Sequence, residues 1–220
     1  DLMQGLIRGV SAALDDDRVE GVIGSYELAF RMQDEMPEVM DLSRESKETL
    51  SLYGADRAPT EAFGKQCLMA RRFAEAGVRF IEISHLEWDL HGALGSGMVR
   101  NCGQIDRPVA GLLEDLDRRG MLDETLVVWG GEFGRTPDDA TTDGRGHNNK
   151  GYTMWLAGGG VRGGHVHGAT DDLGHEAVDG QVHIHDLHAT ILHLLGLDHE
   201  RLTYRHGGRD YRLTDVKGSV

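Results

Sequence analysis

Apolar residues in the N-terminal part of the chain recur at every third or fourth position, the spacing of one face of an α-helix. The pattern predicts helices over about 20–36, 41–54 and 60–77, preceded by another helix near the N-terminus. Residues 1–77 show no grouping of catalytic side chains, so we expect this helical segment to pack on the rest of the chain. The stripe of the first helix consists of Leu2, Leu6, Ile7, Val10 and Leu14.

After Gly77 the pattern changes to short apolar runs rich in β-branched residues, at 78–84, 125–130 and 152–157. Runs of this kind, bounded by glycine and polar loops, are typical of buried parallel strands. Between the first two runs, apolar residues return to helical spacing and predict a helix closed by Gly120. The stripe of that helix consists of Ile105, Val109, Leu112, Leu113 and Leu116.

The order of these elements predicts the fold class. A strand, a helix and a strand joined by short links favour a right-handed α/β arrangement with a parallel sheet. A last helix over 185–196 and a polar tail that can form a small hairpin complete the chain. We therefore expect a helical segment, residues 1–77, packed on an α/β core with a parallel sheet, residues 78–220.

Composition and charge narrow the classes of partner. The formal net charge is −14, which argues against a nucleic-acid partner because phosphate binding needs a basic face. The sequence contains neither an apolar run of about 18 residues that could span a bilayer nor a targeting segment. Two cysteines are too few for a disulfide framework or a cysteine zinc cluster. Because the chain opens on Asp1 within an amphipathic pattern, we expect an upstream piece of the protein.

Three polar stretches next to the predicted strands carry side chains that can bind metals. SHLEWDLHG follows the first strand and offers Asp89 and His91, and GGEFGRTP follows the second and offers Glu132 and Arg135. GRGHNNK precedes the third strand and offers His147. Ligands of open parallel sheets bind outside the carboxyl ends of the strands, so we expect these side chains to meet in one cleft.

The chemistry of this set indicates a transition metal. Asp89, His91, Glu132 and His147 combine carboxylate oxygen with imidazole nitrogen, a mixture that suits zinc, manganese or iron. Calcium is a weaker candidate because it prefers shells made of oxygen alone. Each fragment is also typical of a polar loop whose side chains bind only each other, and that interpretation stays open at this point.

Histidine and aspartate also stand together at the start of the last predicted helix. His185 and Asp186 are placed either to cap that helix or to reach the site. Aspartate is a favoured residue at a helix N-terminus, which favours the cap.

Several long motifs resemble one bacterial family. The chain contains ELAFRMQ, FGKQCLMARRFAEAGVRFIEI, WDLHG, GGEFGRTP, GRGHNNKGYTMWLAGGGVRGG and HDLHATILHLLGLDHERLTYRHGGRD. These motifs resemble the domain-of-unknown-function 1501 family over nearly the whole chain. The segments around GGEFGRTP and the last helix also resemble the alkaline-phosphatase and sulfatase superfamily. The resemblance implies that residues 78–220 are the C-terminal part of an alkaline-phosphatase-like core.

The resemblance to the superfamily implies roles for individual residues. Asp89 and His91 look like the pair that holds one metal, and His147 looks like the third ligand of the same ion. Glu132 stands where the superfamily has the aspartate of a second metal. Phe133 occupies the position of that second metal's histidine, which puts a two-metal site in doubt because phenylalanine cannot bind a metal.

The implied activity is that of a metal-dependent hydrolase acting on phosphate or sulfate esters of small molecules or polysaccharides. Arg135 would supply positive charge and hold an anionic oxygen, which its planar guanidinium suits. The resemblance also implies an exported or periplasmic protein whose nucleophile lies upstream of this chain. The alternative is a non-catalytic exported binding or structural protein that keeps the fold, and Phe133 favours it.

Overall fold

The N-terminal half of the structure is a layer of helices. The computed structural model describes residues 23–24, 26–27, 30, 36–138 and 143–220, so the predicted helix over 2–14 and most of that over 20–36 lie outside the described residues. The helices predicted over 41–54 and 60–77 and the one closed by Gly120 are confirmed. Their bounds are Leu42–Arg44 for the 3₁₀-helix η1, Lys47–Leu52 for α3, Glu61–Glu75 for α4 and Leu94–Arg118 for α5.

The hydrophobic core lies where α4 and α5 pack against each other and against the turn that follows α3. Ile105, Leu112 and Leu116 of the predicted stripe are buried, and Cys67 is buried in the same core, where burial raises the pKa of its thiol to about 12. From the rest of the chain, Ile83 and Val127 pack against this core. The buried core cluster consists of Tyr53, Ala55, Cys67, Leu68, Leu112 and Leu116.

A buried ionic network joins the helices beside this core. The guanidinium of Arg71 donates through Nη2 to Glu45 Oε1 at 2.8 Å and through Nη1 to Glu75. Its Nε lies 3.0 Å from Asp115 Oδ2, close enough for an ion pair but without the direction of a hydrogen bond. The hydroxyl of Tyr53 donates to the same carboxyl group at 2.9 Å, and burial raises the pKa of this phenol. The network therefore ties η1, α3, α4 and α5 together.

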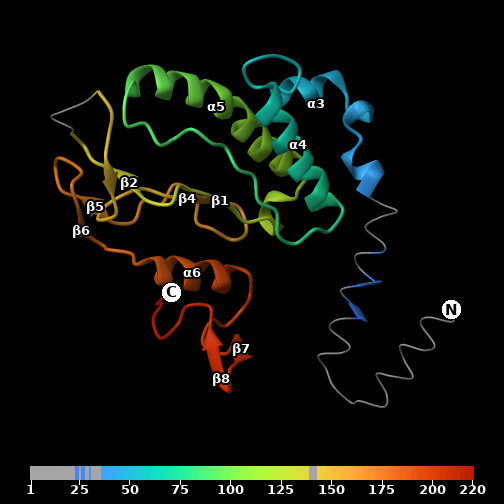
Figure 1. Cartoon of the computed structure of the whole chain (residues 1–220). Coiled ribbons are helices and arrows are strands. Elements are labelled where there is room, and N and C mark those ends of the chain that lie inside the picture. Colours follow the sequence, from blue (N-terminus) through green and yellow to red (C-terminus); the bar gives the residue numbers. More distant parts are fainter. Residues whose placement is uncertain (1–22, 25, 28–29, 31–35, 139–142) are drawn as a thin grey trace, which may run out of the picture.

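The prediction of a parallel sheet is wrong. The described strands form four two-stranded antiparallel pairs (Figure 1). The runs at 125–130 and 152–157 do contain strands, but these pair with each other in opposite directions, with Trp129 opposite Trp155. The pairs are β1 (Val127–Trp129) with β4 (Trp155–Ala157), β2 (Gly134–Arg135) with β3 (His147–Asn148), β5 (Ala169–Thr170) with β6 (Ala177–Asp179), and β7 (Thr203–His206) with β8 (Arg209–Arg212).

The chain between the strands and the lack of a pairing partner explain why no parallel sheet forms. Two parallel neighbours need a crossover, usually a helix, and the described chain between β1 and β4 contains no helix. The run at 78–84 forms no strand, and residues 79–84 make no main-chain hydrogen bond to another described main-chain group. Ile83 packs on the core while Phe80 is 84% exposed. Apolar, β-branched composition alone did not make a strand here, because a strand also needs a neighbour to pair with.

The C-terminal part consists of α6 (Ile184–Leu194) and the β7–β8 hairpin, which confirms the last predicted helix and hairpin. Figure 1 shows α3, α4 and α5 on one side of β1, β2, β4, β5 and β6, and α6 with the β7–β8 hairpin on the other. None of the described helices is long and apolar enough to cross a membrane.

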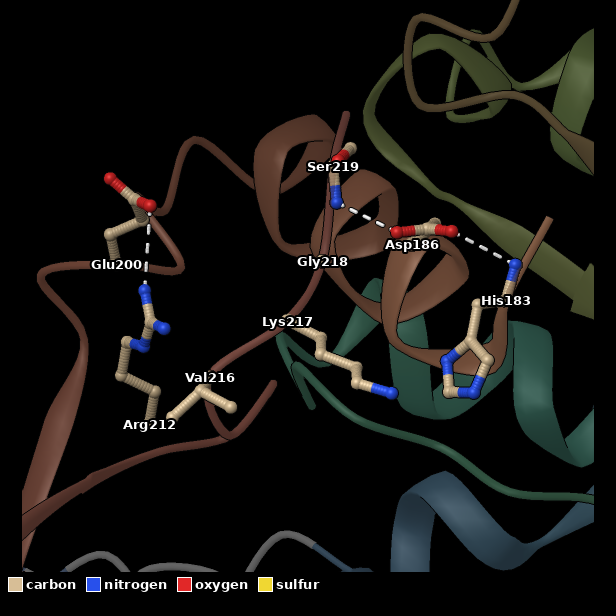
Figure 2. Close-up of a pocket in the computed structure, with 8 residues that line it drawn as sticks. All are labelled: His183, Asp186, Glu200, Arg212, Val216, Lys217, Gly218 and Ser219. Atoms are coloured by element: carbon tan, nitrogen blue, oxygen red, sulfur yellow. Dashed lines mark hydrogen bonds and ion pairs between the residues drawn. The ribbon is translucent and has the colours of Figure 1, made fainter.

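The side chains at the start of α6 form a cap. Asp186 Oδ2 accepts from the main-chain N–H of His183 at 2.9 Å, and its Oδ1 accepts from that of Ser219 at 2.8 Å (Figure 2). These two main-chain donors, that of His183 first, lower the pKa of Asp186. The side chain of His183 accepts in turn from the N–H of His185 at 3.2 Å. The carboxylate of Asp186 is therefore committed to the helix terminus and to the C-terminal segment.

Candidate metal centre

A short antiparallel ribbon places two of the predicted site residues side by side. In the β2–β3 pair, Arg135 is directly opposite His147. Side chains of directly opposite residues lie on the same face of a sheet. The ribbon continues through Thr136, whose N–H donates to Gly146 O at 3.0 Å and whose hydroxyl accepts from Gly146 N–H at 2.9 Å. The main chain therefore fixes the spacing between Arg135 and His147.

The loop that carries Asp89 and His91 is bound to the segment just before this ribbon. Arg145 N–H donates to Leu90 O at 2.9 Å, and Asp143 Oδ1 accepts from Ala93 N–H, next to the start of α5, at 2.8 Å. On the other side, the buried side chain of Asn101 on α5 donates to Glu87 O at 2.7 Å. The loop is thus held between α5 and the segment that leads into β3.

These contacts bring three donor atoms into a small triangle. Asp89 Oδ1 lies 3.0 Å from His91 Nε2 and 3.0 Å from His147 Nε2, and the two imidazole nitrogens are 3.2 Å apart. Each of the three side chains is more than half exposed. A metal ion needs several histidine, cysteine or acidic donor atoms close together. Among the described residues, Asp89, His91 and His147 meet that condition.

The triangle fits a metal ion of the kind that the sequence predicts. Zinc bonds to oxygen and imidazole nitrogen are about 2.0–2.2 Å long, so two ligands of one ion lie roughly 3.0–3.4 Å apart for bond angles between about 90° and 110°. Two histidines and one carboxylate are a known ligand set for zinc and for iron. The donor set and its spacing are therefore compatible with one divalent transition-metal ion.

Arg135 and Glu132 lie beside the triangle rather than in it. Arg135 Nη1 donates to Asp89 Oδ1, and Nη2 donates to Glu132 Oε1 at 3.2 Å. The hydrogen bond from Arg135, and then that from His147, lowers the pKa of Asp89 to about 2. Because a lowered pKa keeps a carboxyl group ionised above that value, Asp89 carries its negative charge throughout the neutral range. Glu132 is not brought into the donor group.

Phe133 packs against the ring of a predicted ligand. Its ring centroid lies 4.4 Å from that of His147, with 41° between the planes. The guanidinium carbon of Arg135 lies 5.4 Å from the same phenyl ring. A phenyl ring in this place supports both neighbours by contact, and neither the periodicity nor the motifs of the sequence indicated this role.

Other polar residues near the loop have structural partners. His85 Nδ1 accepts from the indole N–H of Trp88 at 2.9 Å, so its Nε2 carries the proton donated to Gln104 Oε1 at 3.0 Å. Glu87 forms an ion pair with Arg100 at 3.1 Å. These contacts anchor the loop on α5 and leave the donor triangle to Asp89, His91 and His147.

A separate cleft of about 470 Å³ opens beside α6 (Figure 2). Lys217 and Arg212 line it together with the capping residues His183 and Asp186. The cleft is lined by none of Asp89, His91, Glu132, Arg135 and His147. The candidate centre is therefore identified by its donor chemistry and not by the volume of a cavity.

The main chain at Gly144 lies close to the main chain of His91, which leads to a prediction. A Cβ atom at this position would lie 2.1 Å from His91 C and 2.3 Å from His91 O. Neither main-chain atom can move without shifting the loop that carries Asp89 and His91. We expect Gly144→Ala to lower zinc affinity about 10-fold or more, a cost on the scale of altered ligand support, as measured by competition with a chromophoric chelator.

Gly146 is the matched control for Gly144, two residues away in the same segment. A Cβ at Gly146 would meet Thr136 Oγ1 at 3.4 Å, which is an ordinary contact. Gly146→Ala should therefore bind zinc like the unaltered chain. Equal zinc affinity for the two alanine variants would show that the close approach at His91 does not support the centre.

Comparison with known proteins identifies the family of this chain. No curated protein and no solved structure matches the chain. The family described as "Protein of unknown function (DUF1501)" matches residues 1–220, the whole of the chain. This agrees with the motifs around WDLHG, GGEFGRTP and GRGHNNK, which contain the donor triangle and its arginine. The chain therefore belongs to the DUF1501 family.

Proposed function

We propose that this protein binds one divalent metal ion, zinc first among the candidates, and uses it to hydrolyse phosphate or sulfate esters. The observation that carries the proposal is the triangle of Asp89 Oδ1, His91 Nε2 and His147 Nε2, with sides of 3.0–3.2 Å. Manganese and iron suit the same donors, whereas calcium suits them less because two of the three are nitrogen.

In this proposal the three donors bind the metal ion and the neighbouring Arg135 binds the anionic part of the ester. Three protein ligands leave room for a water molecule or a substrate oxygen, the arrangement of catalytic zinc sites. The ion would polarise the ester oxygen and lower the pKa of a bound water or hydroxyl group. Arg135 would donate to the anionic oxygens of the ester, whose charge a guanidinium stabilises through two parallel N–H groups.

The motif residues also support a relationship to the alkaline-phosphatase and sulfatase superfamily at the level of the site. Asp89, His91 and His147 resemble the ligands of one metal in that superfamily. This part of the proposal concerns the ligand set alone, because the described strands are antiparallel. Small-molecule or polysaccharide esters, with no nucleic acid, and an exported or periplasmic location complete the proposal.

A non-catalytic binding protein is the second candidate, and Phe133 favours it. The phenyl ring packs on His147 at the position where the superfamily has a histidine of a second metal. A protein of this kind would keep the single ion and bind an oxyanion without turning it over.

A zinc titration tests the part that both candidates share. We expect the purified chain to bind one equivalent of zinc per molecule, measured by isothermal titration calorimetry and by elemental analysis after gel filtration. Aryl phosphate and aryl sulfate assays on the same preparation test turnover directly. Turnover that a chelator abolishes would favour the hydrolase over the non-catalytic candidate, whereas the zinc titration alone tests the binding that both share. A chain that binds no stoichiometric zinc, manganese or iron would refute the proposal and leave the histidines as polar loop residues.

A further inference from the structure

Glu132 is the predicted metal ligand that the structure leaves outside the donor triangle, and its contact indicates another role. Its Oε1 accepts from Arg135 Nη2 at 3.2 Å. The other nitrogen of the same guanidinium, Nη1, donates to Asp89 Oδ1. Arg135 is therefore shared between two carboxylates, of which Asp89 alone belongs to the donor group.

One oxygen of Asp89 cannot bind a metal ion and the guanidinium of Arg135 equally well. Asp89 Oδ1 is the atom that lies 3.0 Å from both imidazole nitrogens, so it is the oxygen that an ion in the triangle would take. A divalent cation and a guanidinium on one oxygen repel each other. A metal-loaded centre would thus weaken the hold of Asp89 on Arg135, and Glu132 would remain as the carboxylate that keeps the guanidinium in place.

The surroundings of Arg135 support this arrangement. The side chain is only 23% exposed, and its guanidinium carbon lies 5.4 Å from the ring centroid of Phe133. Its main chain is fixed in the ribbon opposite His147. In the structure Nη1 donates to Asp89 Oδ1 and Nη2 donates to Glu132. An ion on Asp89 Oδ1 would release Nη1 to donate to an oxygen of an anion, while Glu132 would keep Nη2.

We propose that Glu132 is a positioning residue that holds Arg135 beside the metal centre for a tetrahedral oxyanion, and that it does not bind the metal. The proposal rests on the proposed function, because it needs an ion on Asp89. It replaces the role of second-metal ligand that the family resemblance implies for Glu132.

Two substitutions of Glu132 test whether its role is to hold Arg135 in place or to supply a negative charge. Glu132→Gln keeps the length of the side chain and an oxygen that accepts from Nη2. Glu132→Asp keeps the charge, but its carboxylate is one methylene further from Arg135. The probes are zinc alone and then inorganic phosphate added to the zinc-loaded chain, both followed by calorimetry.

We expect both variants to bind one equivalent of zinc with an affinity within about threefold of the unaltered chain. Phosphate should bind the Gln variant as tightly as the unaltered chain, or more tightly because a negative charge is gone. The Asp variant should bind phosphate about 3- to 10-fold more weakly, a modest loss because the ion pair is partly exposed. In an Arg135→Ala background, Glu132→Asp should cause no further loss.

Two results would overturn the proposal. A loss of zinc affinity of 10-fold or more in both variants would identify Glu132 as a metal ligand. An equal loss of phosphate affinity with and without Arg135 would show that Glu132 does not act through the arginine. An unaltered chain that binds no zinc would instead refute the proposed function itself, and with it the reason for placing an oxyanion beside Arg135.

Discussion

Replacing His147 with alanine is expected to lower the zinc affinity of the chain by at least about 100-fold. His147 supplies one of the three donor atoms, and its Nε2 lies 3.0 Å from Asp89 Oδ1 and 3.2 Å from His91 Nε2. Loss of a partner that only supports a ligand already costs about 10- to 100-fold in metal affinity, so loss of the ligand itself should cost more. The measurement is competition for zinc with a chromophoric chelator.

His165 is the control for this substitution. It is an exposed histidine in a glycine-rich stretch, and its ring contacts that of His167 at 6.3 Å. His165→Ala removes the same group and should leave zinc affinity unchanged. If the two variants bound zinc equally, the triangle of Asp89, His91 and His147 would not be the metal centre.

The second large effect is expected at Arg71, which lies on α4 in the helical layer and outside the donor triangle. The side chain is 3% exposed and faces three carboxylates, of which those of Glu45 and Asp115 are 9% exposed. Arg71→Met would remove the buried cation that Glu45 and Asp115 share. It would leave Glu45 paired with Arg72 and Asp115 with the partly exposed Arg119. Breaking a buried ion pair from one side costs about 3–5 kcal/mol, a large share of the roughly 5–15 kcal/mol that stabilises a typical domain.

Urea denaturation followed by circular dichroism measures this loss. Arg118 offers the matched control, because it pairs with Glu114 on the exposed face of α5 and its side chain is 63% exposed. Arg118→Met should change the free energy of unfolding far less, since exposed pairs contribute little. A loss below about 1 kcal/mol for Arg71→Met would mean that water or neighbouring side chains compensate the carboxylates.

The helices could be predicted from the sequence because their cause is local. Apolar residues at helical spacing and the glycines that follow them identified α4, α5 and α6, and Ile105, Leu112 and Leu116 lie in the core as the stripe requires. The start of α5 at Leu94 was not predicted. The N–H of Ala93, just before the helix, and that of Leu94, its first residue, donate to Asp143, which is distant in the sequence. A contact of that kind leaves no local signal.

Strand direction could not be predicted in the same way. The runs at 125–130 and 152–157 have the composition of strands, and β1 and β4 do form within them. Composition carries no information on whether two strands run parallel, because pairing depends on the path of the chain between them. The run at 78–84 shows the same limit, since its apolar residues pack on helices without a ladder partner.

The residues of the candidate centre were chosen from the sequence, but for a reason that the structure replaces. We expected Asp89, His91 and His147 to meet at one edge of a parallel sheet. They meet instead because the β2–β3 ribbon presents His147, and because hydrogen bonds from Arg145 and to Asp143 bring the Asp89 loop to it. Their role as metal ligands stays a prediction.

The sequence by itself determined the helices, the family and the types of side chain at the centre, since periodicity, motifs and ligand chemistry are properties of short stretches. Only the tertiary structure decided that the strands are antiparallel, that Arg135 bridges Asp89 and Glu132, and that Phe133 packs on His147. These features depend on contacts between segments separated along the chain. Such contacts are set by the packing of the whole chain, and no single stretch of residues encodes them.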